Sequence, residues 1–297
     1  MEKWEKYRKE LPYSYCFGPY PSFRLLEEAP ERVLALLLSD KFKEKEKVEA
    51  LAAEKALPLI YAPRLIEKLS QRANTYMIAV FLKELPSSEK SKTLSLRAER
   101  TSQNTLTNPA KENSTSGRQV ILQNIDDMGN LGTILRSLLA FDCPCLNLLG
   151  PCCDLWDPRV VRASMGAIFA LRPQFYSSLE AWRERNSELL LAALMLDKTA
   201  ESPRSWLSQR SVEELSGLCL AFGNEGSGLP SYYRESADAC LMIPQSLKVD
   251  SLNLAEAVSI SLYEWQEQLH ARSVAKATPS APFSFFSFHL PGKAVIK

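Results

Sequence analysis

The feature that most constrains this chain is a repeated alternation of apolar runs and helical segments from about residue 119 onward. The apolar runs predict strands, and they read RQVILQNI, CLNLLG, AIFALRPQF, LLLAALML, LCLAFG and ACLMIP. Apolar residues recur at helical spacing in the segments NLGTILRSLLAF, PRVVRASMG, LEAWRERN, PRSWLSQR and LPSYYRES. This alternation predicts an α/β fold with a mostly parallel sheet covered on both faces, and such sheets bind ligands beyond the carboxyl ends of their strands.

The residues before this region predict a second, smaller α/β unit. A helix is expected over RVLALLLSDKFKEKEKVEALAAEKA and another over PRLIEKLSQRA, with strands at LPLIYAP and YMIAVFLK. From Pro86 the composition becomes polar, which is typical of a flexible linker. We therefore expect a small domain at 1–85, a linker at 86–117, the main domain at 118–272 and a tail at 273–297.

Charge and composition exclude several classes of protein. Lys and Arg number 36 against 35 for Asp and Glu, so no bulk field points to nucleic acid or membrane, and any RNA-binding surface must be local. The charged N-terminus MEKWEKYRKE does not resemble a signal peptide, and the chain contains no apolar run long enough to cross a bilayer. We expect a cytoplasmic protein.

The seven cysteines do not predict a metal site. Cys143 and Cys145 form a C-x-C pair and Cys152 and Cys153 a C-C pair, neither of which has the C-x-x-C spacing of structural zinc sites. The two histidines lie near the C-terminus, at 270 and 289, which also disfavours Ser-His-Asp or Cys-His catalysis. The expected role of the cysteines is that of small buried side chains in a reducing compartment, with no metal.

A first candidate site follows the strand RQVILQNI. In IDDMGNLGTILRSLLAF, Asn130 stands where a helix is expected to start, and Arg136 follows six residues later. A planar, permanently charged guanidinium near a helix N-terminus suits bidentate phosphate binding. A capped helix with an incidental surface arginine is the alternative.

A second candidate site is the glycine-rich segment GNEGSGLP at 223–230. Three glycines after an apolar strand allow the backbone to lie against a flat or charged ligand, and Glu225 projects from the loop. The segment is neither a P-loop nor G-x-G-x-x-G, and a plain tight turn is the alternative. Glu225 could orient Arg136 through a charge-assisted pair.

The third candidate segment is IPQSLKVDSLNLAEAVSISLYEW. Ile243 and Pro244 end a strand, and Asp250 or Ser251 could cap the next helix. Ser251 and Asn253 bring a hydroxyl and an amide to the start of that helix, and capping explains only one of them. The expected apolar face of the helix consists of Leu252, Leu254, Ala255, Val258, Ile260 and Leu262.

Taken together and in order, N-x-G-x-x-x-R, G-x-E-x-x-G and I-P-x(6)-S-L-N resemble the SpoU/TrmH family of RNA 2′-O-ribose methyltransferases. VRASMGAIF at 161–169 is similar to the family segment between the first two motifs. The resemblance covers about 118–268 and implies an α/β fold with a C-terminal trefoil knot, S-adenosylmethionine bound in that knot, and a homodimer. The region before the linker resembles, more weakly, the family's small substrate-binding domain.

Carried onto this chain, the resemblance assigns roles residue by residue. It implies that Gly223, Ile243 and Leu252 hold the cofactor through backbone contacts. It assigns a catalytic and RNA-facing set to Asn130, Arg136, Glu225, Ser251 and Asn253. The chain departs from the family at Gln245, where methionine is usual, and at Leu247, where glycine is frequent.

The resulting prediction is methylation of a ribose 2′-hydroxyl in RNA. Arg136 would anchor the neighbouring phosphate, because a permanently protonated guanidinium is a poor base, and help in removing the proton of the 2′-hydroxyl is the alternative role. The extra N-terminal domain favours ribosomal RNA as the substrate. Methylation of transfer RNA, or RNA binding without catalysis on the same fold, are the alternatives; a doubly wound nucleotide-binding enzyme would lack its phosphate loop.

Overall fold

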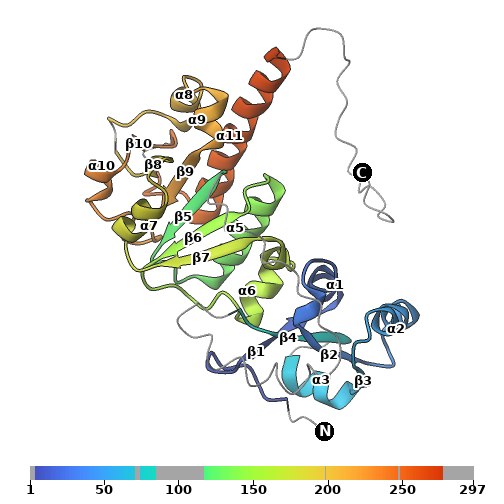
Figure 1. Cartoon of the computed structure of the whole chain (residues 1–297). Helices are drawn as coiled ribbons and strands as arrows, with labels where there is room; N and C mark the ends of the chain where they lie inside the picture. Colours follow the sequence, from blue (N-terminus) through green and yellow to red (C-terminus); the bar gives the residue numbers. More distant parts are fainter. Residues whose placement is uncertain (1–3, 71–73, 85–116, 198, 247, 277–297) are drawn as a thin grey trace.

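The computed structural model describes residues 4–70, 74–84, 117–197, 199–246 and 248–276. Most of the linker expected at 86–117 and of the tail expected at 273–297 lies outside the described residues. Figure 1 shows two units, one built from residues 4–84 (the N-terminal unit) and the other from 117–276 (the C-terminal unit). Each unit has its own sheet.

The sheet of the N-terminal unit has four strands in the order β1-β4-β2-β3. β4 is antiparallel to both β1 and β2, while β2 and β3 are parallel. The elements in chain order are β1 (Tyr13–Phe17), α1 (Pro19–Glu28), the 3-10 turn η1 (Pro30–Arg32), β2 (Val33–Leu38), α2 (Lys45–Glu54), β3 (Leu59–Tyr61), α3 (Pro63–Ser70) and β4 (Met77–Leu82).

The two faces of this sheet enter different apolar clusters. On one face Tyr15, Leu37 and Val80 pack with residues of α3. On the other face Leu36 and Phe81 pack with residues of α1 and α2, and this second cluster continues into the C-terminal unit. Because successive side chains of a strand point to opposite faces, one face of the sheet packs on α3 and the other faces the C-terminal unit.

The helix expected over RVLALLLSDKFKEKEKVEALAAEKA is wrong in its first part. Val33–Leu38 forms strand β2, and the helix α2 begins only at Lys45. The run VLALLL carries no polar residue to mark a solvent face, so it suits a strand buried on both sides as well as a helix, and pairing with β4 decides for the strand. Strand β1 and helix α1 were not anticipated.

The C-terminal unit contains six strands in the order β10-β8-β9-β5-β6-β7, and all five pairings are parallel. This confirms the predicted mostly parallel α/β sheet. Its strands are β5 (Gln119–Gln123), β6 (Cys145–Leu149), β7 (Arg172–Tyr176), β8 (Leu190–Leu194), β9 (Leu218–Phe222) and β10 (Ala239–Leu241). Its helices are α5 (Met128–Ala140), α6 (Pro158–Ala163), η3 (Ala167–Ala170), α7 (Leu179–Arg185), α8 (Pro203–Leu207), α9 (Val212–Ser216), α10 (Tyr233–Ser236) and α11 (Leu254–Lys276).

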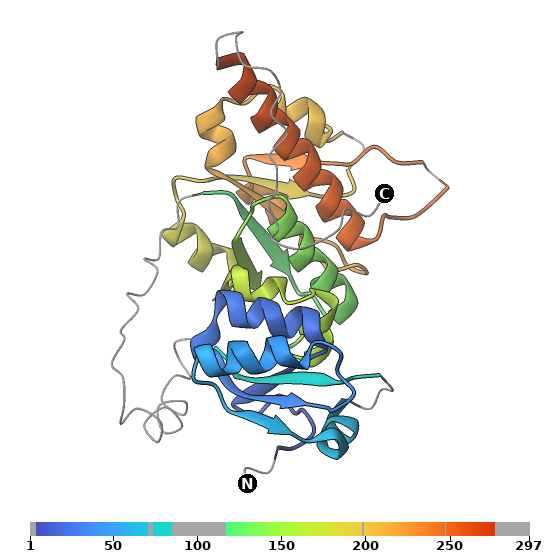
Figure 2. The same ribbon diagram turned by 90° about the vertical axis from the view of Figure 1, so that its right-hand side faces the viewer.

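Helices cover both faces of this sheet. Val120 and Leu122 of β5 point into the cluster that includes α5, α6 and α11, whereas Ile121 points into the cluster of α7 and α10. The views agree that α5 and α11 run side by side (Figures 1 and 2). No helix among the described residues is long and apolar enough to cross a membrane.

The strand expected over AIFALRPQF begins later than the sequence indicates. Ala167–Ala170 forms the 3-10 turn η3, and only Arg172–Tyr176 pairs with β6. Ala167, Ile168 and Phe169 are all buried, because this turn packs between α1 and α5 rather than in the sheet. The apolar run AIFA, which follows Gly166, therefore forms a buried 3-10 turn instead of the start of a strand.

Candidate functional site

A cavity of about 490 Å³ opens at the carboxyl ends of β8, β9 and β10. This is the edge of the sheet at which the sequence predicts ligand binding. All three residues predicted to hold the cofactor, Gly223, Ile243 and Leu252, line the cavity, and so do Glu225 and Ser251. The structure thus brings together two sequence segments about thirty residues apart in one cavity wall.

Gly223 has no room for a side chain. A Cβ built on this residue would lie 2.1 Å from the Gly228 carbonyl carbon and 2.2 Å from the Leu229 nitrogen. The glycine is therefore required by a close approach of two backbone segments. The loop between them folds back through an isolated antiparallel bridge between Asn224 and Gly228.

Asn224 fixes this loop, a role that the sequence analysis missed. Its Oδ1 accepts hydrogen bonds from the backbone nitrogens of Gly226 (2.8 Å) and Ser227 (3.3 Å), while its Nδ2 donates to the Asn124 carbonyl oxygen (2.9 Å) and to Asp126 (3.2 Å). The side chain therefore ties the glycine-rich loop to the loop after β5. A side-chain amide next to three glycines was a signal for such a turn.

Asn130 connects the second and third motifs. Its Nδ2 donates to Glu225 Oε1 at 2.6 Å, and its Oδ1 accepts from Asn253 Nδ2 at 3.0 Å. These residues lie 95 and 123 positions away in the chain, so the bridge exists only in the folded molecule. Three of the five predicted catalytic residues thus form one hydrogen-bonded chain.

Two details of the predicted helix starts are wrong. Helix α5 is capped by Asp127, whose carboxylate accepts from the Asn130 backbone nitrogen at 2.6 Å, so Asn130 stands one turn inside the helix. Helix α11 is capped by Asn253, whose Oδ1 accepts from the Ala255 nitrogen at 2.9 Å, rather than by Asp250 or Ser251. Because other residues cap the two helices, the Asn130 side chain bonds to Glu225 and Asn253, and Ser251 lines the cavity.

Arg136 is exposed on α5. The expected pair with Glu225 is not formed: Glu225 accepts its hydrogen bond from Asn130, and among the residues that the structure describes Arg136 has no hydrogen-bond or ion-pair partner. Arg136 lies six residues beyond Asn130, about one and two-thirds turns along α5, and the side chain that contacts Glu225 is that of Asn130. Arg136 is therefore available to an external anion.

The apolar face predicted for α11 is mostly confirmed. Leu254, Ala255, Val258 and Leu262 are buried, whereas Ile260 is 39% exposed and Leu252 belongs to the cavity wall. Of the two departures from the family, Gln245 lines the cavity and Leu247 lies outside the described residues.

An ion pair at the rim of the cavity was also missed. Arg234, which lines the cavity, pairs with Asp197. Asp197 Oδ1 accepts from the hydroxyl (2.7 Å) and the backbone nitrogen (3.0 Å) of Thr199. The Thr199 hydrogen bonds and Arg234 together lower the pKa of Asp197 to about 2, so this carboxylate stays ionised and holds Arg234 in place.

The cysteines are all free thiols. Burial raises the pKa of Cys16 and Cys219 well above the usual range and that of Cys143 to about 12, so these side chains are neutral. Among the residues that the structure describes, no group of three or more His, Cys, Asp or Glu side chains could hold a metal ion.

Residues 117–263 match the model of the SpoU rRNA Methylase family. Through these residues the chain belongs to the SpoU rRNA methylase family. The matched range contains all eight predicted site residues.

Curated relatives match about half of the chain. An uncharacterized tRNA/rRNA methyltransferase of Synechocystis is 32% identical over 154 residues, which cover 52% of this chain and 54% of the relative. The 23S rRNA (adenosine(1067)-2′-O)-methyltransferase of Streptomyces azureus is 30% identical over 157 residues, with coverages of 51% and 55%. The chain therefore spans about half the length of the curated relatives it matches.

Solved structures extend the similarity of fold to nearly the whole chain. An AdoMet-bound rRNA methyltransferase from Sinorhizobium meliloti superposes with a TM-score of 0.64 at 24% identity, covering 87% of this chain and 88% of that one. The SpoU methyltransferase AviRb from Streptomyces viridochromogenes superposes with a TM-score of 0.66 at 21% identity, with coverages of 88% and 91%. At this identity the comparison establishes the fold.

Proposed function

We propose that the protein is an S-adenosylmethionine-dependent methyltransferase that modifies a ribose 2′-hydroxyl in RNA. The observation that carries the proposal is the convergence of the three motifs at one cavity edge. Gly223, Ile243 and Leu252 line the cavity, and Asn130 joins Glu225 to Asn253 beside it. The curated relatives named as RNA methyltransferases support the same conclusion.

The cavity suits the proposed cofactor. Its volume of about 490 Å³ falls within the usual range of small-molecule sites, about 300–1,000 Å³. Residues 223–229 of the glycine-rich loop and Ile243 line it, and the position of Gly223 leaves no space for a side chain. When bound, the cofactor supplies an electrophilic methyl group on sulfur.

The residues of this chain then position the RNA. Arg136 is exposed and binds the phosphate next to the target ribose, since its guanidinium can make two parallel hydrogen bonds to a phosphate. The ribose and the glycine-rich loop are held in fixed positions by the hydrogen-bonded chain of Asn130, Glu225 and Asn253. Ser251 lines the cavity and supplies a hydroxyl there. Well-oriented reacting groups can gain on the order of 7–11 kcal/mol, so positioning supplies much of the acceleration.

Ribosomal RNA is the favoured substrate. The Streptomyces azureus relative is named for 23S rRNA, and the rRNA methyltransferase from Sinorhizobium meliloti resembles this chain in both units. We assign residues 1–85 the role of a small RNA substrate-binding domain, separated by the linker 86–117 from the methyltransferase domain 118–272. Transfer RNA methylation is the alternative substrate class.

A C-terminal trefoil knot and a homodimer complete the proposal. The close backbone crossing of Gly223 with Gly228 and Leu229 is consistent with a tightly threaded loop. Helix α11 carries two exposed apolar side chains, Ile260 (39%) and Tyr263 (49%), and the latter packs its ring against Phe141. We propose that a second copy of the chain covers this face. The molar mass in solution, measured by light scattering, should then be twice that of one chain.

Calorimetric titration and RNA mapping test the activity. We expect the purified protein to bind S-adenosylmethionine at one site per chain. It should also transfer a tritiated methyl group to total RNA from cells that lack the active protein, at a nucleotide located by 2′-O-methyl mapping. Cofactor binding without methyl transfer would favour the alternative of an RNA-binding protein without catalysis. If the deficient cells retained every 2′-O-methylated position, the proposal of an enzyme would be refuted.

A further inference from the structure

The two units share one continuous apolar core. The cluster that contains Leu25 and Phe81 of the N-terminal unit also contains Trp156 and Phe169 of the C-terminal unit. Helix α1 packs on the turn at Gly166, where an added Cβ would lie 2.9 Å from Arg24 Cβ and 3.0 Å from Pro21 Cα. The N-terminal unit therefore contacts the C-terminal unit closely through its buried surface.

A buried arginine joins the units. Arg32 is 6% exposed, and its guanidinium carbon lies 4.3 Å from the ring centroid of Trp156, 5.3 Å from that of Phe81 and 5.6 Å from that of Phe169. Its Nε donates to the Leu82 carbonyl oxygen at 3.0 Å. A cation stacked on rings from both units is a directional contact that fixes their relative orientation.

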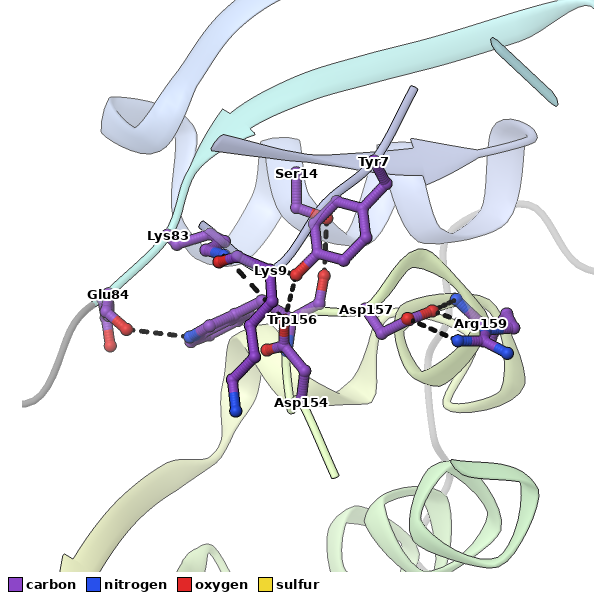
Figure 3. A network of polar contacts seen from close by, with 9 residues as sticks. All are labelled: Tyr7, Lys9, Ser14, Lys83, Glu84, Asp154, Trp156, Asp157 and Arg159. Carbon is purple, nitrogen blue, oxygen red and sulfur yellow. Dashed lines mark hydrogen bonds and ion pairs between the residues drawn. The ribbon is translucent and has the colours of Figure 1, made fainter. Parts of the chain in front are cut away.

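A second buried cation is held across the same boundary (Figure 3). Lys83, with a side chain 3% exposed, lies 3.9 Å from the carboxylate of Asp154 in the C-terminal unit and donates to the Lys9 carbonyl oxygen at 2.6 Å. The Tyr7 hydroxyl donates to the same carboxylate. Burial first, and then the bond to Asp154, raise the pKa of Tyr7, so its hydroxyl remains a donor.

Trp156, whose ring lies under the Arg32 guanidinium, is held by hydrogen bonds at its side chain and at its backbone. Its Nε1 donates to the Glu84 carbonyl oxygen at 2.8 Å, and its own carbonyl oxygen accepts from Ser14 Oγ at 2.5 Å (Figure 3). The segment 154–156 follows β6, whose carboxyl end lies on the same edge of the sheet as the cofactor cavity. The anchoring segment is thus part of the loop layer that carries the site.

A freely tethered unit would not bury charges against its neighbour, because a buried charge without its partner is strongly unfavourable. We propose that the contacts of Lys83 with Asp154, and of Arg32 with Trp156, lock the N-terminal unit in one position, so that RNA binds both units as a single preformed surface of fixed spacing. The proposal rests on the function proposed above. Lys83 and Asp154 are then positioning residues for RNA, since neither lines the cavity.

The test uses the full-length protein with Asp154→Asn and Lys83→Met, which remove one charge each at nearly constant volume. Arg204→Ala is the control, because the exposed Arg204 pairs with Glu264 at 3.2 Å within the C-terminal unit alone. Spin labels on p-acetylphenylalanine at Tyr61 (46% exposed) and Tyr232 (40% exposed) avoid the seven cysteines and report the distance between the units. Labelled chains are diluted with unlabelled ones so that only distances within a chain are recorded.

We expect a single narrow distance in the unsubstituted protein and in the control, and a broad distribution in both variants. The KM for RNA should rise about tenfold in the variants, because a preformed surface avoids the cost of ordering the two units on binding, while the cofactor Kd and kcat stay within about twofold. Cofactor binding also reports whether a variant has folded.

A broad distribution in the unsubstituted protein would overturn the proposal, and so would broad distributions in the variants with an unchanged KM for RNA. If neither variant broadens the distribution, Trp156→Ala, which removes the ring shared with Arg32, must do so for the proposal to stand. Absence of methyl transfer by the unsubstituted protein would instead count against the proposed function, since the distance measurement does not depend on activity.

Discussion

Gly223→Ala is the substitution for which the structure gives the clearest expectation. The new Cβ would lie 2.1 Å from the Gly228 carbonyl carbon and 2.2 Å from the Leu229 nitrogen, and both of these are backbone atoms. Packed carbon atoms normally lie about 3.5–4.0 Å apart, so the first contact would be short by about 1.4 Å or more. Since no rotamer change can relieve it, one of the two backbone segments must move.

The expected magnitude follows from the cost of overpacking. Forcing extra methyl groups into a filled site costs about 1–3 kcal/mol and occasionally more. About half of that cost appears as lower stability, a fall of roughly 2–6 °C in Tm. The remainder displaces the cavity wall and weakens S-adenosylmethionine binding by roughly three- to tenfold, at about 1.4 kcal/mol per factor of ten.

Two other glycines provide controls. At Gly226, in the same loop, the nearest atom to an added Cβ is Asn224 Oδ1 at 3.4 Å, and at Gly217, outside the cavity, the nearest atoms are at 3.6 Å. Gly226→Ala should therefore leave Tm within about 2 °C, and Gly217→Ala should leave both Tm and cofactor affinity nearly unchanged. Differential scanning calorimetry and isothermal titration measure the two quantities. Wild-type affinity and Tm in Gly223→Ala would refute the close-approach argument.

Three further outcomes are expected from the site. Arg136→Ala should abolish methyl transfer in a tritium assay while the cofactor Kd stays within about twofold, because Arg136 is exposed and does not line the cavity; substantial residual transfer would contradict the phosphate-anchor role. Asn130→Ala should lower kcat roughly ten- to a hundredfold, the value of a charge-assisted hydrogen bond, and Asn130→Asp should lower it further by placing a second carboxylate 2.6 Å from Glu225 Oε1; equal effects of the two variants would exclude a role for charge. Asp197 has a folded-state pKa lowered to about 2 from 3.8, so its contribution to stability is present above about pH 4 and is lost as the pH falls towards about 2. Asp197→Asn should flatten the acid side of the Tm-against-pH curve in that window, and an unchanged slope would show that Arg234 and Thr199 do not stabilise the carboxylate.

The sequence by itself determined the class of fold of the C-terminal unit, and it predicted residues that the structure places at one cavity. Apolar runs such as QVILQ and LCLAF alternate with helical segments over short stretches, and such local periodicity needs no knowledge of distant contacts. The resemblance to the SpoU/TrmH family implied that Gly223, Ile243 and Leu252 hold the cofactor, and all three line the cavity. Their roles in catalysis remain predictions.

The tertiary structure alone decided how distant segments meet. VLALLL became a strand because β4 pairs with it, and AIFA became a turn because α1 and α5 pack against it. The partner of Glu225 is Asn130 rather than Arg136, and that choice depends on where α5 enters the layer of loops beside the cavity. The contacts of Arg32 and Lys83 with the C-terminal unit join residues more than seventy positions apart, and no local pattern encodes them. Periodicity specifies an element, whereas packing and hydrogen bonding between elements specify its partners.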